Sequence, residues 1–369
     1  MICRFTVTHS VIDAERGNDV HKVYLEEHQP GSQILEVNCS YVLAVKTGQQ
    51  ISEFLVLSEE EKNISIVLEF CFLGFENLQG LQMLVFSFLS FFYILTLVGN
   101  LAIIGITTLD AHLNGPMFYL LRHLSILDIC YISVTVPKML DTLLSGQHTI
   151  SFTGCMVQLS LFISLEGTEA FLLTAMAYDR FIAICYPLRY TLLMDRKLCL
   201  LLAGASWVSG IMNSVVHTTL IVRLPFCGSN CLQNVFCDIP PLLHLSCADT
   251  HLNELVLFTV GGTLVGLIPF LSILVSYIYI AATIVKMSSN SGKQKAFSTC
   301  ASHLIVVTLF YGAAIFTYIR PASTYGLERD RLVSVLYSIV TPMLNPLIYS
   351  WRSQELKRAF KRLQSPLYY

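Results

Sequence analysis

The sequence has few charged residues. Of its 369 residues, 13% are Asp, Glu, Lys or Arg, whereas 54% are hydrophobic and the mean hydropathy is +0.62. A soluble globular domain carries about 25% charged residues. Length alone would suggest two or three soluble domains, but the shortage of charge excludes that organisation and indicates contact with lipid.

A cleavable signal peptide is also missing, because the first residues, MICRFTVTHSVIDAERGND, contain no apolar core of adequate length. We expect the first membrane helix to act as an uncleaved signal anchor and residues 1–79 to form an extracellular tail. No Met occurs between Met1 and Met83, so we expect residues 1–60 to be disordered or to reflect a mis-assigned start of translation. Of the glycosylation sequons at Asn38 and Asn63, Asn63 is favoured because it stands a short way before the first helix.

Seven apolar windows account for the hydrophobic excess. A helix needs about 20 mostly apolar residues to cross a bilayer, and lipid offers backbone groups no water, so each window is expected to be helical. Seven windows of this length disfavour the alternative, which is soluble core helices. The sequence therefore predicts an all-α membrane protein with a seven-transmembrane helix bundle over residues 80–351. The windows are residues 77–109, 113–137, 153–185, 198–222, 255–285, 296–319 and 332–351.

Lys and Arg in the short connections predict the orientation. With the N-terminus outside, twelve of them fall in the inner segments and five in the short outer ones. We therefore expect a multi-pass protein of the plasma membrane with a cytoplasmic tail, residues 352–369. Apolar residues in that tail recur at i, i+4 and i+7, which predicts a short amphipathic helix on an anionic membrane surface rather than a solvated one. Its apolar side would be Leu356, Phe360 and Leu363, and its basic side Lys357, Arg358, Lys361 and Arg362.

Ionisable residues inside the windows are candidates for function, because they are expensive in a membrane. Glu166, Glu169 and Arg180 recur at close to whole helical turns and share one face, which should look into the bundle. Asp128 lies in the second window. Glu166 would bond either a ligand or a neighbouring helix, and a buried carboxyl group there could be neutral and donate a hydrogen bond.

The twelve cysteines divide by position. Cys155 begins the third window, and Cys227, Cys231, Cys237 and Cys247 lie in a long outer loop, where disulfides persist. A zinc site of Cys227, Cys231, Cys237 and His244 is an alternative, although C-x3-C-x5-C matches no common zinc spacing. Cys3 and Cys39 lie in the N-terminal tail. Five others are expected to be small buried residues in or beside helices: Cys71, Cys130, Cys185, Cys199 and Cys300.

A series of motifs, each at the expected end of a helix, indicates a family. They are GN at 99–100, PMFYLLRHLSILDICYISVTVPKML at 116–140, MAYDRFIAICYPLRY at 176–190, LPFCGSN at 224–230, FCDIPPLLHLSCADT at 236–250, SY at 276–277, KAFSTCASHL at 295–304, FYG at 310–312 and PMLNPLIYSWR at 342–352. From about residue 63 onward, the chain resembles a rhodopsin-like G-protein-coupled receptor, specifically a vertebrate olfactory (odorant) receptor. It departs at Phe181, where Tyr is usual, and at Ser353, where Asn is usual.

The resemblance implies several sites. It implies the disulfides Cys155–Cys237 and Cys227–Cys247, with Cys231 left free or as an alternative partner. An activation switch would comprise Asp179, Arg180, Tyr277, Asn345, Pro346 and Tyr349, with the Asp179–Arg180 pair as a latch in the resting state. A hydrated polar cluster would comprise Asn100, Asp128, Glu169 and Asn345. Neighbouring carboxylates share a proton or a cation, so this cluster holds a sodium ion, a proton or a purely structural network. The implied ligand pocket comprises Phe162, Ile163, Glu166, Ala170, Gly261, Gly262, Val265, Tyr311, Ala314, Ile315 and Tyr318.

The function implied is an odorant receptor that binds small, mostly hydrophobic volatile molecules and activates a heterotrimeric G protein of the stimulatory olfactory type to raise cyclic AMP. A non-olfactory chemoreceptor of the same family is the alternative. A transporter or channel is disfavoured, since the sequence has no internal repeat or matching broken helices. An enzyme is disfavoured because His217, His303 and the acids form no catalytic motif. We expect no nucleic-acid partner and no cofactor, apart from the sodium ion near Asp128 and Glu169.

Overall fold

The structure is a computed structural model that describes two compact units of the chain, Met1–Ile64 and Ser65–Tyr369. Within them the described residues are 2–7, 10–17, 20–25, 35–38, 42–47, 50–56, 67–74, 80–227, 230–318, 339–349 and 354–364.

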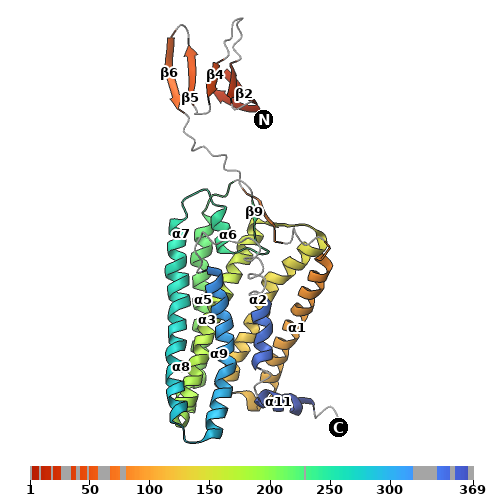
Figure 1. Cartoon of the computed structure of the whole chain (residues 1–369), viewed down its shortest axis with the longest axis vertical. Coiled ribbons are helices and arrows are strands. Elements are labelled where there is room, and N and C mark those ends of the chain that lie inside the picture. The colour runs from red at the N-terminus through yellow and green to blue at the C-terminus, as the bar shows by residue number, and fades with distance from the viewer. Residues whose placement is uncertain are drawn as a thin grey trace. The chain divides into compact units, whose positions relative to one another are not determined.

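The first unit contains β-strands (Figure 1). β1 (Ile2–Val7), β2 (Ser10–Gly17), β3 (Val20–Leu25) and β4 (Leu35–Asn38) form an antiparallel sheet in that order, and β5 (Val42–Thr47) pairs with β6 (Gln50–Val56). Residues 1–60 were expected to be disordered or to reflect a mis-assigned start of translation, and the structure has strands within this range. A search for long apolar runs misses strands because their period is two, as in β1, where Cys3, Phe5 and Val7 alternate with Arg4 and Thr6.

The second unit is a bundle of long apolar helices, which confirms the predicted fold class. Among the described residues, six of them are long and apolar enough to cross a membrane, and a shorter apolar helix covers Ile339–Tyr349. The six are α1 (Gln82–Leu109), α2 (Pro116–Ser145), α3 (Phe152–Cys185), α5 (Arg196–Val222), the continuous helix α7 (His251–Val256), η3 (Leu257–Leu267) and α8 (Ile268–Lys286), and α9 (Asn290–Tyr318). The tail helix is α11 (Gln354–Gln364), and shorter turns are η1 (Ala111–Leu113), η2 (Pro187–Arg189), α4 (Tyr190–Leu193) and α6 (Ile239–His244).

Local signals in the sequence set the ends of these helices. Ser151 caps α3 by accepting a hydrogen bond from the amide of Gly154 at 3.1 Å, and Asp195 caps α5 in the same way. The second predicted window ends too early, at residue 137. Although Pro137 lacks an amide hydrogen, α2 continues through it to Ser145. It stops where Gly146 takes the left-handed conformation, at φ 68°.

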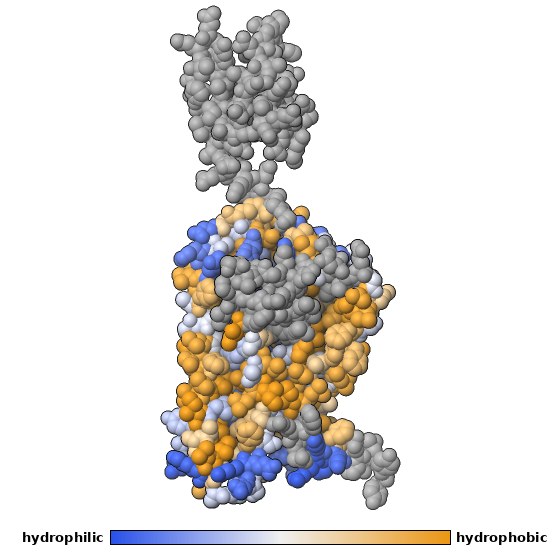
Figure 2. Space-filling model, viewed as in Figure 1, coloured by the Kyte–Doolittle hydropathy of each residue, from blue (hydrophilic) through white to orange (hydrophobic). Residues whose placement is uncertain are grey.

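Helix α3 is the most buried of the six spans and forms the centre of the bundle. It approaches α5 so closely that a Cβ atom on Gly167 would lie 3.2 Å from the Cα of Gly210. Apolar residues on the outside of the bundle remain exposed, including Leu101 and Leu201. On the face that Figure 2 shows, apolar residues form a band over the helices, with hydrophilic residues toward both ends, which is the surface expected of a protein embedded in lipid.

A small sheet and three disulfides cover one end of the bundle. The sheet has the order β8-β7-β9 and comprises β7 (Glu69–Phe72), β8 (Thr149–Ser151) and β9 (Cys231–Leu232). The structure contains Cys155–Cys237 and Cys227–Cys247, the pairs that the resemblance implies, and a third bond, Cys71–Cys231. The expectation that Cys71 is an unbonded residue beside a helix is therefore wrong: it lies in β7, directly opposite Cys231 in the parallel pair. With these cysteines bonded to one another, the alternative zinc site is wrong as well.

Candidate ligand pocket and activation switch

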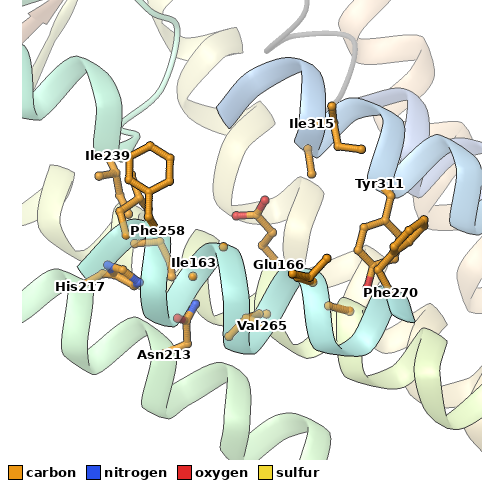
Figure 3. Close-up of a pocket in the computed structure, with 18 of the residues that line it drawn as sticks. Ile163, Glu166, Asn213, His217, Ile239, Phe258, Val265, Phe270, Tyr311 and Ile315 are labelled. Carbon is orange, nitrogen blue, oxygen red and sulfur yellow. The ribbon is translucent and has the colours of Figure 1, made fainter. Parts of the chain in front are cut away.

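A cavity of about 460 Å³ lies in the half of the bundle that carries the disulfides. It is bounded by α3, α5, η3, α8 and α9, and Ile239 of α6 contributes from the loop above (Figure 3). Its walls are mostly apolar. The lining residues are Ile163, Glu166, Gly167, Ala170, Asn213, His217, Ile239, Leu257, Phe258, Gly261, Gly262, Val265, Gly266, Leu267, Phe270, Phe310, Tyr311, Ala314 and Ile315.

Most of the predicted pocket residues line this cavity. The exceptions are Phe162 and Tyr318 of the implied set. Phe162 turns away from the cavity and packs between Tyr131 and Phe236, with ring centroids at 5.2 and 4.9 Å. It faces α2 because neighbouring residues on a helix point about 100° apart, so only Ile163 of this pair faces the cavity. The side chain of Tyr318 lies outside the described residues.

Two polar residues of the cavity, Asn213 and His217, were missed by the sequence analysis. Both project from α5, one turn apart, and are 8% and 3% exposed. The sequence signal that could have grouped them is their spacing of four residues, which places two side chains on the same face of a helix. A window without charges gives little indication of which face is turned inward, and the close contact of Gly167 with Gly210 sets that face.

The wall formed by η3 is a π-helix of eleven residues. Thr263 Oγ1 donates to the carbonyl of Phe258, five residues earlier, at 3.1 Å, and the amide of Ile268 donates to the carbonyl of Thr263. Gly261 has no side chain to fill the cavity and lies against the imidazole of His217. A Cβ atom added to Gly261 would lie 3.4 Å from His217 Nε2. Such wide turns are often found at functional sites, and here they widen the helix where the cavity is lined.

The four residues of the predicted polar cluster are all buried below the cavity. Asn345 Nδ2 donates to Asp128 Oδ1 at 2.9 Å and also interacts with Glu169, whereas Asn100 Nδ2 bonds the carbonyl of Pro342 at 3.4 Å. One oxygen atom on each residue has no hydrogen-bond partner among the described residues: Asn100 Oδ1, Asp128 Oδ2, Glu169 Oε1 and Asn345 Oδ1. These oxygens fit a hard cation such as sodium or a shared proton.

The Asp179–Arg180 pair is buried at the opposite end of α3, with 3.7 Å between Asp179 Oδ2 and an Arg180 Nη2. Tyr190 of α4 donates a hydrogen bond to the other carboxylate oxygen at 2.7 Å. Burial, followed by the charge of Asp179, raises the pKa of the Tyr190 phenol, so this hydroxyl stays protonated and remains a donor. Tyr190 was not predicted as a switch residue, because a loop tyrosine carries no periodic signal.

The predicted switch tyrosines lie near this pair without bonding it. The hydroxyl of Tyr277 of α8 lies 2.9 Å from His303 Nδ1 of α9, and His303 Nε2 lies 3.0 Å from the carbonyl oxygen of Leu173. Since a carbonyl only accepts, Nε2 carries the proton, and Nδ1 accepts the hydrogen bond that Tyr277 donates. Tyr349 is buried, and its hydroxyl has no partner among the described residues. Pro346 packs against α1 at Gly99, where an added Cβ would lie 3.2 Å from the proline ring.

Helix α11 docks on the bundle by its basic side as well as its apolar side. Leu356 is buried, but Arg362, expected on the membrane-facing basic side, donates from Nε and Nη2 to Asp110 Oδ2 at 3.0 and 2.5 Å. Hydrogen bonds from Arg362 and from His112 hold the pKa of Asp110 down at about 2. The side chain of Leu363 lies outside the described residues.

A bundle of this kind, with an apolar cavity at its disulfide-bearing end and a buried Asp–Arg pair at the other, defines a heptahelical membrane receptor of the rhodopsin-like class. Residues 89–365 match the family model described as "Olfactory receptor". Human olfactory receptor OR9H1 is 49% identical over 306 residues, which is 83% of this chain and 99% of that protein. Human olfactory receptor 10C1 is 50% identical (81% of this chain, 96% of that protein), and mouse olfactory receptor 5G29 is 47% identical (82% and 96%). The chain therefore belongs to the olfactory receptor family of G-protein-coupled receptors, which are not enzymes.

Proposed function

We propose that this odorant receptor binds small, mostly hydrophobic volatile molecules in the cavity and activates a heterotrimeric G protein of the stimulatory olfactory type, raising cyclic AMP. The plasma membrane would hold it with the disulfides outside and the basic connections and α11 inside. The cavity carries this proposal. At about 460 Å³ it lies within the roughly 300–1,000 Å³ range of small-molecule pockets, and few of its lining residues offer a polar atom.

Helix α3 supports a direct route from ligand to G protein. The same continuous helix carries Glu166 at the cavity and Arg180 at the far end. In the resting receptor, Asp179 neutralises Arg180, so that neither charge is buried alone. Tyr190 fixes the carboxylate in place. On activation, Arg180 would leave Asp179, and the hydroxyl of Tyr277 would exchange His303 for Arg180 as α9 moves outward.

The polar cluster would link the two ends. We propose that Asp128 and Glu169 share a sodium ion or a proton there, with Asn345 bonded to Asp128 as described. The residues themselves would supply oxygen ligands and hold the charge in a fixed place. Signalling of Asp128→Asn measured across a series of sodium concentrations separates the two: a sodium dependence that the variant loses supports the ion, and an unchanged dependence removes it.

The function is tested by ligand-evoked cyclic AMP in cells with and without the stimulatory olfactory G-protein α-subunit, at equal surface expression. A broad panel of volatile ligands is applied to both lines. We expect some ligands to raise cyclic AMP only where that subunit is present. A ligand response of equal size in its absence would refute the proposed coupling, and no response to any ligand would refute the proposed odorant binding.

A further inference from the structure

The cavity is apolar except for four polar side chains in its lining. Glu166 of α3 projects its carboxyl group into the space that Asn213 and His217 of α5 border on one side and Tyr311 of α9 on the other (Figure 3). Asn213, His217 and Tyr311 are more than nine-tenths buried. The atoms Asn213 Oδ1, His217 Nε2 and Tyr311 OH have no hydrogen-bond partner among the described residues. Buried polar atoms left in this state favour a bound group that bonds them.

The hydrogen-bonding character of this group is dominated by acceptors. A carboxylate and an amide oxygen only accept, and the phenol and the imidazole can accept as well as donate. A ligand rich in donors can therefore satisfy all four of them at once. An ammonium group has three donors and no acceptor, whereas an alcohol has a single donor.

The local charge favours the same ligand. The carboxyl group of Glu166 repels that of Glu169, which in turn repels that of Asp128. No Lys or Arg is found among the described residues that line the cavity. A cation placed at Glu166 would offset this accumulation of acids inside a low-dielectric bundle, where neighbouring negative charges are costly.

We propose that the preferred ligands are small apolar amines, whose ammonium group binds Glu166 while Asn213 and His217 accept its other hydrogen bonds. The hydrocarbon part would lie against η3 and α9, where Gly261, Val265 and Ile315 leave an apolar space. Organic acids would be excluded, since their carboxylates would face Glu166. This inference rests on the proposed function, and it assigns the ligand class to the same cavity.

The test compares ligands that differ only in the polar group. Three matched pairs serve: cyclohexylamine with cyclohexanol, hexylamine with hexanol, and 2-phenylethylamine with 2-phenylethanol, with hexanoic acid as the excluded class. Each is applied to the full-length receptor, to Glu166→Gln and to a control variant, Glu254→Gln, which changes an exposed carboxyl group outside the cavity. Cyclic AMP is measured at matched surface expression, and thermal stabilisation of the purified receptor by each ligand is measured in parallel.

At least one amine should activate the receptor at a lower concentration than its alcohol. Glu166→Gln should raise the half-maximal concentration of that amine about 30-fold or more, the usual consequence of truncating a buried charged pair, and Glu254→Gln should not. Hexanoic acid should activate neither the native receptor nor the control. Activation by alcohols with no preference for amines, or an amine response that Glu166→Gln leaves unchanged, would overturn the inference and leave the proposed function standing. If no ligand activates the receptor, the proposed function fails, and stabilisation by amines then decides the inference alone.

Discussion

The contact between α3 and α5 gives the sharpest prediction of stability, through two glycines of α5. At Gly210, an added Cβ would clash with Thr168 Oγ1 and the carbonyl oxygen of Ser164, and would lie 2.7 Å from the amide nitrogen of Thr168. At Gly204, on the same helix, an added Cβ would meet nothing within 4 Å. The variants Gly210→Ala and Gly204→Ala therefore make the same chemical change in opposite surroundings.

The expected effects differ in sign. Ala is favoured over Gly in a helix by about 0.5–1 kcal/mol, so Gly204→Ala should stabilise the receptor slightly. At Gly210 the clashing atoms include backbone, which cannot rotate away, and overpacking of this kind costs about 1–3 kcal/mol. The helices must then separate. Because Asn213 and His217 follow on the same face of α5, the separation also moves them away from Glu166.

Thermal unfolding of the two purified variants, followed beside the native receptor in one detergent, checks the reasoning. The midpoint for Gly210→Ala should fall by several degrees, and that for Gly204→Ala should stay or rise. Ligand response should weaken in Gly210→Ala alone. Equal midpoints for the two variants would refute the close helix contact described here and the orientation of α5 that depends on it.

Two further predictions concern the other end of the bundle. Tyr190→Phe removes a hydrogen bond to the Asp179 carboxylate, and such bonds contribute about 1.5–3 kcal/mol. Basal cyclic AMP at equal surface expression should therefore rise. The control is Tyr186→Phe, which changes an exposed tyrosine of the same loop, and a basal level in Tyr190→Phe no higher than in this control would contradict the latch. The pairing of Arg362 with Asp110 holds a carboxyl pKa at about 2, below its unfolded value, so its contribution to docking α11 is complete above about pH 4. This contribution is lost as the pH falls through about 2. In the native receptor in detergent, the mobility of a spin label on α11 should therefore increase near that pH. In Arg362→Gln the mobility should already be high at neutral pH. Mobility that already rises between pH 7 and 5 in the native receptor would contradict the assignment.

The sequence predicted the helices well because lipid simplifies the problem. Long runs without charge must be helical in a membrane, and the windows agree with the helices to within a few residues at most ends. Pro137 shows the limit, since a proline can lie inside a helix that continues for about two more turns. The strands of residues 2–56 show another limit, because apolar residues that alternate with polar ones over a short strand leave no long apolar run.

The candidate site was predicted less completely, for geometric reasons. The acids Glu166, Glu169 and Asp128 could be recognised because a charge in an apolar window is conspicuous. Asn213 and His217 could not be assigned to the cavity, because their orientation depends on where α5 touches α3. Phe162 was wrongly assigned to the cavity, which its neighbour Ile163 faces instead. Tyr190 could not be predicted because it lies in a loop that only folding brings to Asp179.

The three disulfides have a consequence for how the chain matures. Cys71 bonds a residue 160 positions later, and Cys155 bonds one 82 positions later. Six cysteines allow 15 pairings, and all three bonds must wait until four membrane helices and the loop after them have been synthesised, because each bond uses at least one cysteine of that loop. In the proposed orientation these cysteines face an oxidising compartment, where Cys71 and Cys155 are open to the wrong partners until then. The disulfide-bearing end of the bundle would therefore be completed only after more than half of the membrane helices have been made, and disulfide isomerisation would be the step that corrects wrong pairs.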